Sequence, residues 1–368
     1  MNDTGAAFLP GLELCRAFYA EAVRPLLDGA FPGLRHAAAR VGPGSEVLGF
    51  DGERSVDHDW GPRLELFLSP TDAQQHGAAI DALLSQRLPK RFRGWPTHFE
   101  PPGARVRSMA YTDGPVAHRV VVTDVGTWSQ RQLGFDGRGG VTVFDWLATP
   151  GQRLAEATGG AVYHDGIGEL SALRAALARY PDDVWRYILA CQWLRIGEEE
   201  AFVGRAAEAG DDAGSRVVAG RLVREVMRLS LLLAGRFPVY SKWLGTAFRT
   251  LPEAAGIAEG CRTALAAEHA GARQAALCDA YELAGEWQNR LGLAPPVDAT
   301  RRPYFDRPYP VIGAGRFAEA LLAEVADPEV AALPPVGAVD QYVDSTAALT
   351  EPRLARALMA AVRPAVQP

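Results

Sequence analysis

Two aspartates one residue apart, Asp57 and Asp59, stand just before a segment whose apolar residues are spaced like a strand, Arg63 to Leu68. If the pair belongs to that strand, alternate side chains point to the same side, so the two carboxylates lie side by side and His58 faces away. Adjacent carboxylates repel each other unless a cation lies between them. A divalent cation that prefers oxygen ligands, most plainly Mg²⁺, is the expected occupant.

A Gly-Ser turn, Gly44-Ser45, precedes the aspartate pair. Glycine has no side chain, so its backbone can approach a phosphate closely. Serine offers both a hydroxyl and a backbone N–H to the same group. The turn followed by the carboxylate pair therefore predicts a phosphate and a cation bound close together.

This order and spacing resembles the signature of the nucleotidyltransferase superfamily, the polymerase-beta-like fold. The sequences of Gly49–Asp51 and Asp57–Arg63 are similar to those of one branch, the DUF4037 family of bacterial proteins. The resemblance extends over nearly the whole chain. It implies that the aspartates hold Mg²⁺ against a nucleoside triphosphate, ATP being favoured, while the Gly-Ser turn cradles the phosphates.

The reaction implied is transfer of a nucleoside monophosphate to a hydroxyl of a small-molecule acceptor, with loss of pyrophosphate. The acceptor is expected in a cleft between two domains. Because the superfamily also contains members without catalysis, a nucleotide-binding or regulatory protein is the alternative. A protein or tRNA acceptor is a third hypothesis.

A nucleotidyltransferase usually carries a third carboxylate on a neighbouring strand, as a metal ligand or as the base for the acceptor hydroxyl. The β-branched run from His118 to Asp124 predicts that strand, but its centre is valine. The candidates are Asp124 at its end, Glu65 on the first strand and Glu100 in a loop. We favour Asp124.

The expected fold class is α+β: a nucleotidyltransferase-like mixed sheet with helices over residues 1–160, then an all-α helical bundle over residues 161–368. Apolar spacing predicts a helix over 8–29, and another over 72–87 with Thr71 as its N-cap. Residues 89–118 are rich in Arg, Gly and Pro and predict a loop-rich segment.

A second motif, Pro238–Phe248, contains Ser241 and Lys242. It resembles the C-terminal domain of aminoglycoside adenylyltransferases, which implies that Lys242 contacts nucleotide phosphate. Ser241 is expected to cap a helix whose N-terminus favours anions, and the lysine adds a mobile positive charge. The chain has one other lysine, Lys90, so each is informative; a surface lysine in a first helical turn is the plain alternative.

The net charge of −6 argues against a dedicated nucleic-acid binder, without excluding one. No apolar run approaches the roughly 18 residues of a membrane span, and the first ten residues lack a signal-peptide pattern. We therefore expect a cytoplasmic protein without a membrane partner. The four cysteines form no CxxC pair and predict buried free thiols and no zinc site: Cys15, Cys191, Cys261 and Cys278.

Overall fold

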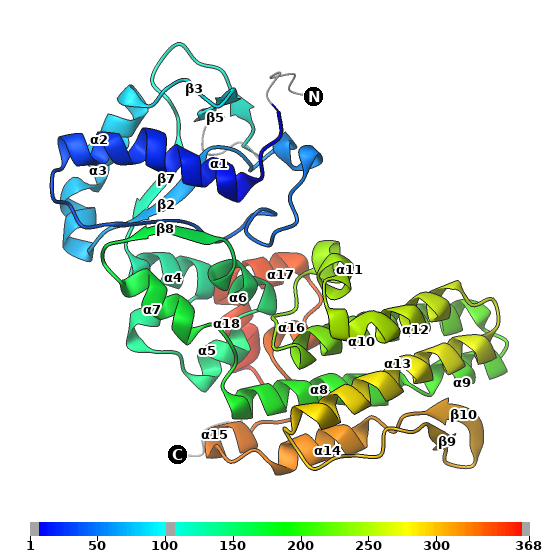
Figure 1. The fold of residues 1–368 in the computed structure, drawn as a ribbon. Coiled ribbons are helices and arrows are strands. Elements are labelled where there is room, and N and C mark those ends of the chain that lie inside the picture. Colours follow the sequence, from blue (N-terminus) through cyan, green and yellow to red (C-terminus); the bar gives the residue numbers. More distant parts are fainter. Residues whose placement is uncertain (1–6, 101–106, 363–368) are drawn as a thin grey trace. The chain divides into compact units, whose positions relative to one another are not determined.

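The structure, a computed structural model, describes residues 7–100 and 107–362. The predicted loop-rich segment 89–118 therefore lies partly outside the described residues. The chain forms two compact units (Figure 1). The first unit is Met1–Val141 with Arg153–Ala178, and the second unit is Thr142–Gln152 with Arg179–Pro368.

A four-stranded mixed sheet forms the centre of the first unit, in the order β7-β2-β1-β8. Strands β2 and β7 are parallel, whereas β1 is antiparallel to both β2 and β8. The strands are β1 (Ala37–Arg40), β2 (Arg63–Phe67), β7 (Arg119–Thr123) and β8 (Ala161–Asp165). The predicted strands at 63–68 and 118–124 are thus confirmed, and so is the mixed sheet.

Helices pack on this sheet through apolar side chains. The predicted helix over 8–29 consists of α1 (Gly11–Phe18), a π-helical turn (Tyr19–Val23) and α2 (Arg24–Ala30). Phe18 from α1 and Leu64 and Leu66 from β2 belong to one fully buried cluster. The apolar stripe of the helix and the apolar face of the strand therefore bury each other.

The second predicted helix is α3 (Pro70–Arg87), and its cap differs from the expectation. Ser69 is the N-cap, because its Oγ accepts a hydrogen bond from the backbone N–H of Asp72 at 3.1 Å. Pro70 occupies the first helical position, where its fixed φ suits a helix start and its missing N–H is no loss. Thr71 already lies inside the first turn, so its prediction as the cap was wrong.

The rest of the first unit consists of short elements. Four two-residue strands form two small pairs: β3 (Arg91–Phe92) with β4 (Trp95–Pro96), and β5 (His98–Phe99) with β6 (Met109–Ala110). The helices are α4 (Val125–Leu133), a 3₁₀ turn (Gly137–Gly139), α6 (Gly151–Thr158) and α7 (Glu169–Ala176).

The two units divide the chain elsewhere than the predicted boundary between residues 160 and 161. Strand β8 lies beyond that boundary but pairs with β1, so residues 153–178 belong to the first unit. Conversely, α5 (Val143–Ala148) belongs to the second unit. Sheet pairing, which joins residues far apart in sequence, decides this division.

The second unit is largely helical, as predicted. Its longest helices are α8 (Asp182–Glu199), α10 (Asp212–Leu233) and α13 (Ala270–Leu291). Helix α10 packs against α8, α13, α9 (Phe202–Glu208), α11 (Ser241–Arg249) and α12 (Ala255–Ala266). The remaining helices are α14 (Gly315–Ala323), α15 (Pro328–Ala331), α16 (Val339–Tyr342), α17 (Thr346–Thr350) and α18 (Pro352–Ala360).

One hairpin corrects the expectation of an all-α second domain. Strands β9 (Arg302–Tyr304) and β10 (Arg307–Val311) pair antiparallel. Just before them, Arg301 forms ion pairs with Asp279 and with Glu282 of α13, the second at 2.7 Å. The Arg-rich segment is therefore fastened to the helices.

The four cysteines are free and buried, as predicted. Burial raises the pKa of the Cys15 thiol to about 12, so it is inert as a nucleophile at neutral pH. Among the helices described, none is long and apolar enough to cross a membrane.

Candidate functional site

The Gly-Ser turn follows β1 and is a compact helical turn closed by its own backbone. The N–H of Val47 donates to the carbonyl of Gly44 at 3.2 Å, and the N–H of Phe50 donates to the carbonyl of Ser45 at 2.9 Å. Ser45 is half-buried, and its hydroxyl has no hydrogen-bond partner among the described residues. The turn therefore leaves one hydroxyl available to a ligand.

Gly44 is required at its position by close packing. A Cβ there would lie 2.6 Å from Arg40 Nη2 and 2.6 Å from Glu46 Oε2. Any larger residue would push these two side chains apart. The glycine thus has a structural role besides the phosphate approach predicted for it.

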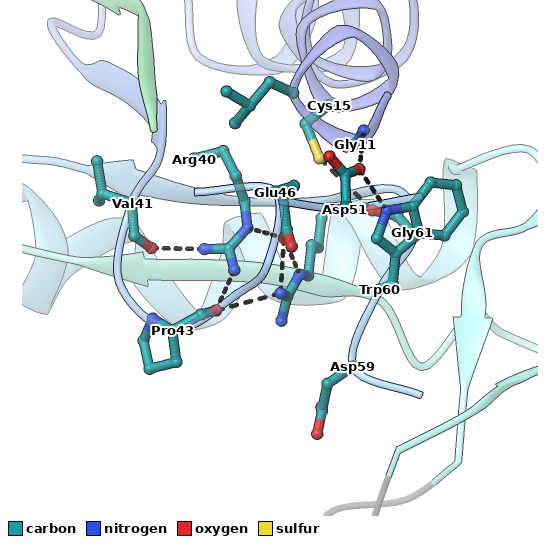
Figure 2. Close-up of polar contacts among 12 residues, drawn as sticks. Gly11, Cys15, Arg40, Val41, Pro43, Glu46, Asp51, Asp59, Trp60 and Gly61 are labelled. Atoms are coloured by element: carbon teal, nitrogen blue, oxygen red, sulfur yellow. Dashed lines mark hydrogen bonds and ion pairs between the residues drawn. The ribbon is translucent and has the colours of Figure 1, made fainter. Parts of the chain in front are cut away.

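Beneath the turn lies a buried ionic cluster that joins β1, the turn and β2 (Figure 2). Glu46, only 2% exposed, accepts from Arg40 Nε at 2.8 Å and from Arg63 Nη2 at 2.7 Å. Arg40 also reaches Glu65 Oε1 at 3.2 Å and the carbonyl of Pro43. The strands and the turn are thereby held as one piece.

Charge in this cluster is well compensated. Burial raises the pKa of Glu46, but the neighbouring charges of Arg63 and Arg40 outweigh burial and lower it to about 2. Glu46 is therefore ionised at all physiological pH values, as a buried ion pair needs.

A second polar contact fixes the segment between the turn and the aspartate pair (Figure 2). Asp51 Oδ2 accepts from the backbone N–H of Gly11 at 2.7 Å and from Trp60 Nε1 at 3.1 Å. Trp60 is buried and stacks on Phe8 with ring centroids 5.8 Å apart. Because Trp60 is the neighbour of Asp59, this contact positions the aspartate loop against the start of α1.

The aspartate pair does not lie on the strand, which corrects the prediction. Asp57 closes a 3₁₀ turn, Glu53–Asp57, and Asp59 has a positive φ of 49°. The strand begins only at Arg63, because Gly61 has a φ of 132° and a proline, which cannot donate to a ladder, follows it. The alternation argument therefore does not apply to these two side chains.

Both carboxylates are accessible nevertheless. The side chain of Asp57 is 64% exposed and lies 2.9 Å from His58 Nδ1, so the histidine contacts the carboxylate and does not face away from it. The side chain of Asp59 is 47% exposed and pairs with Arg119 of β7. In Figure 2 the Asp59 carboxylate points away from the Glu46 cluster.

Arg119 is the partner that the sequence reasoning did not anticipate. Burial and the charge of Arg63 lower its pKa to about 10, against the opposing effect of Asp59. It remains charged at neutral pH. Arg63 and Arg119 are register partners in the parallel β2–β7 pair. The sequence signal that could have located Arg119 is an arginine at or next to the start of each predicted strand.

Each of the three candidates for a third carboxylate already makes hydrogen bonds or ion pairs in the structure. Asp124 is the N-cap of α4: its Oδ1 accepts from the N–H of Thr127 at 2.9 Å and lies 3.7 Å from Arg138. Burial raises its pKa, but the hydrogen bonds from Thr127 and the charge of Arg138 bring it below the ordinary value. Glu65 belongs to the ionic cluster, and Glu100 accepts from the N–H of Ser108 at 3.3 Å.

No group of three or more His, Cys, Asp or Glu side chains suited to a metal ion occurs within residues 7–100 and 107–362. Asp57 and Asp59 offer exposed carboxylate oxygens, the ligand type that Mg²⁺ prefers. Mg²⁺ usually keeps several waters and takes its other ligands from substrate phosphates.

The second motif forms the start of α11, with one correction. Tyr240 is the N-cap, and Ser241 is the first helical residue, so Ser241 does not cap the helix as predicted. Lys242 is exposed, with its Nζ 4.9 Å from the centroid of the Trp243 ring. The segment before the helix is fixed by Gly151, where a Cβ would lie 2.6 Å from the carbonyl oxygen of Pro238.

Comparison with known proteins gives a match to a protein family and a likeness to a solved structure. Residues 146–244 match the family described as Domain of unknown function (DUF4037). No curated protein matches the chain. A crystal structure of a nucleotidyltransferase-like protein from Exiguobacterium sibiricum is similar at 13% identity with a TM-score of 0.30, over 76% of this chain and 79% of that one.

The match to DUF4037 comes from a part of the sequence that does not include the aspartate pair. The match runs from α5 to α11, whereas the sequence segments that resemble the family are Gly49–Asp51 and Asp57–Arg63. The DUF4037 resemblance is therefore borne out over residues 146–244, and the aspartate motif, which lies outside that match, stays a prediction.

Proposed function

We propose that this protein is a divalent-cation-dependent nucleotidyltransferase that uses a nucleoside triphosphate, with ATP as the proposed donor. One observation carries the proposal. The turn that holds Ser45 is joined through Glu46 to Arg63, the first residue of β2, and the exposed Asp57 and Asp59 stand on the loop that leads into the same strand.

Asp57 and Asp59 would hold Mg²⁺, which when bound neutralises charge on the triphosphate. Ser45 would offer its hydroxyl to a phosphate oxygen, and Gly44 would keep the backbone close. The rigid ionic cluster beneath supports this cradle, because preorganised donors need no rearrangement when charge develops.

The transfer itself is an in-line displacement. The acceptor hydroxyl oxygen forms a bond to the α-phosphorus, the bond from that phosphorus to the bridging oxygen breaks, and pyrophosphate leaves. The hydroxyl proton passes to a carboxylate, for which we propose Asp124. Its lowered pKa makes it a weak base. A small-molecule acceptor is proposed by analogy of family alone. The phosphate roles of Ser241 and Lys242 stay predictions.

A non-catalytic nucleotide-binding or regulatory role is the second candidate, and two observations favour it. Asp124 already serves as a helix cap, and Asp59 is already paired with Arg119. Both contacts would have to give way or be shared during catalysis. The two roles predict the same triphosphate binding but differ in turnover.

The test is calorimetric binding of ATP, GTP, CTP and UTP with Mg²⁺. Wild type is compared with Asp57→Ala/Asp59→Ala. The matched control is Asp28→Ala/Asp81→Ala, which removes the same charge from two exposed aspartates of the first unit, 61% and 68% exposed. We expect binding to wild type and control and none to the double variant. If wild type binds no triphosphate, the proposal fails.

Turnover separates the enzyme from the binding protein. Pyrophosphate release from the preferred triphosphate is followed while acceptor pools are added. Release that depends on an acceptor and disappears in Asp57→Ala supports the transferase. Tight binding without release under every acceptor supports the regulatory role.

A further inference from the structure

Two arginines face each other across the parallel strands of the sheet. Arg63 of β2 and Arg119 of β7 are direct register partners. Neighbouring strands are about 5 Å apart, so like charges at facing positions destabilise the pair unless each is compensated. Each arginine here has its own carboxylate: Glu46 for Arg63 and Asp59 for Arg119.

The two carboxylates differ in what else they can bind. Glu46 is 2% exposed and shared with Arg40, so no ion from solvent can reach it. Asp59 is 47% exposed and sits on the loop that also carries Asp57. Asp59 is thus the carboxylate of the two that a solvent cation can take from its arginine.

The Arg119 side chain has a packing contact besides its ion pair with Asp59. Its side chain is 19% exposed, and its guanidinium carbon lies 5.5 Å from the centroid of the Phe99 ring. Asp59 is its sole ion-pair partner in the described part of the chain, while Arg63 and Arg107 act on it with like charge. Without Asp59 it would need another anion at the same place.

We propose that Arg119 competes with free divalent cations for Asp59 and transfers to a phosphate oxygen when the cation arrives bound to a triphosphate. This inference rests on the proposed function. A bare cation at Asp59 adds positive charge beside three arginines and leaves Arg119 unpaired. A cation carrying a triphosphate supplies the missing negative charge, and an arginine pairs well with phosphate. The site is thereby biased against metal alone and toward the metal–nucleotide complex.

The test measures two affinities in one set of variants. Mn²⁺, a paramagnetic divalent probe, is titrated with and without ATP, and free Mn²⁺ is followed by electron paramagnetic resonance. Arg119→Gln is compared with wild type. The control is Arg93→Gln, which breaks another exposed Arg–carboxylate pair of the first unit, Arg93 with Glu21.

We expect opposite changes. Arg119→Gln should bind Mn²⁺ alone about threefold more tightly, because a partly exposed ion pair no longer competes. It should bind the Mn²⁺–ATP complex about tenfold more weakly, because a charge-assisted hydrogen bond to phosphate is lost. Adding Asp59→Asn should cancel the gain for free Mn²⁺, and Arg93→Gln should behave as wild type.

A purely structural role would give a different result. Loss of packing lowers both affinities together and lowers the unfolding temperature, and that outcome overturns the inference. Unchanged affinity of Arg119→Gln for free Mn²⁺ also overturns it. Failure of wild type to bind Mn²⁺–ATP refutes the proposed function and the phosphate half of the inference, while the free-metal comparison still decides whether Arg119 competes for Asp59.

Discussion

Glu46 and Arg63 connect the Gly-Ser turn to the first residue of β2, with Glu46 Oε1 2.7 Å from Arg63 Nη2. The contact is buried, and Arg40 of β1 completes it from the other side. Three pieces of backbone that the candidate site needs in fixed positions therefore depend on one carboxylate.

Replacing that carboxylate should be costly. Glu46→Gln leaves the buried Arg63 without its counter-charge and leaves Arg40 with Glu65 alone. Breaking a buried ion pair costs about 3–5 kcal/mol of unfolding free energy. Urea unfolding followed by circular dichroism measures the loss. The control, Glu21→Gln, breaks an exposed pair with Arg93 and should cost less than about 1 kcal/mol. Equal losses in both variants would contradict the assigned role.

The same residue predicts a response to acid. The pKa of Glu46 is lowered from 4.5 to about 2 in the folded state, so its contribution is complete above about pH 4.5 and is lost as the pH falls toward 2. At about 1.4 kcal/mol per pKa unit, that contribution is about 3 kcal/mol. The difference in unfolding free energy between wild type and Glu46→Gln should therefore shrink between pH 5 and pH 3. A constant difference would argue against the lowered pKa.

Asp51 should stabilise the first unit through its two hydrogen bonds. Asp51→Ala removes the acceptor of the Gly11 N–H and of Trp60 Nε1, which should cost about 2 kcal/mol. Trp60 fluorescence should shift as its ring loses this contact, and Trp60→Phe identifies the signal. Asp28→Ala, on the exposed Arg24–Asp28 pair, is the matched control and should leave both readings unchanged.

Asp124 can be tested as a cap and as a base with two variants. Asp124→Asn keeps an oxygen for the N–H of Thr127 but removes the charge, so stability should stay near wild type. Asp124→Ala loses the cap as well and should cost about 1 kcal/mol. Both should retain triphosphate binding and lose turnover if Asp124 accepts the proton. Full turnover in Asp124→Asn would leave the cap as its only role.

Removal of divalent metal should separate binding from folding. The described residues contain no group of three or more His, Cys, Asp or Glu side chains suited to a metal ion, and our prediction is that the protein folds without one. Excess EDTA should leave the unfolding temperature within about 2 °C, because little binding energy is linked to folding, and should abolish ATP binding. A large fall in unfolding temperature would indicate a structural metal.

Local patterns in the sequence predict much of the fold. The β-branched run before Asp124 and the alternating apolar residues after Arg63 each specify a strand, because burial on a pleated surface needs that period. The cap of α3 fell two residues earlier than expected because Pro70 fixes the helix start. The pairing of β8 with β1 could not be foreseen, since no local signal encodes a partner more than 120 residues away.

The candidate site was only partly accessible to the same reasoning. Asp57 and Asp59 are exposed on one loop, but Gly61 and the proline after it end the strand before it reaches them. The Arg40–Glu46–Arg63 cluster and the Asp59–Arg119 pair depend on tertiary proximity. Charged residues at strand starts indicate that such pairs exist, but they do not identify the partner residue.

The position of β8 in the sequence has a consequence for how the protein is made. A ribosome completes residues 142–152 of the second unit before it reaches Ala161, so β1 emerges with β2 available but its other neighbour still unsynthesised. An unpaired strand edge offers free N–H and C=O groups to other chains. Strand β1 therefore stays an uncovered edge until Asp165 has left the ribosome, and exposed strand edges are the condition under which growing chains aggregate or engage chaperones.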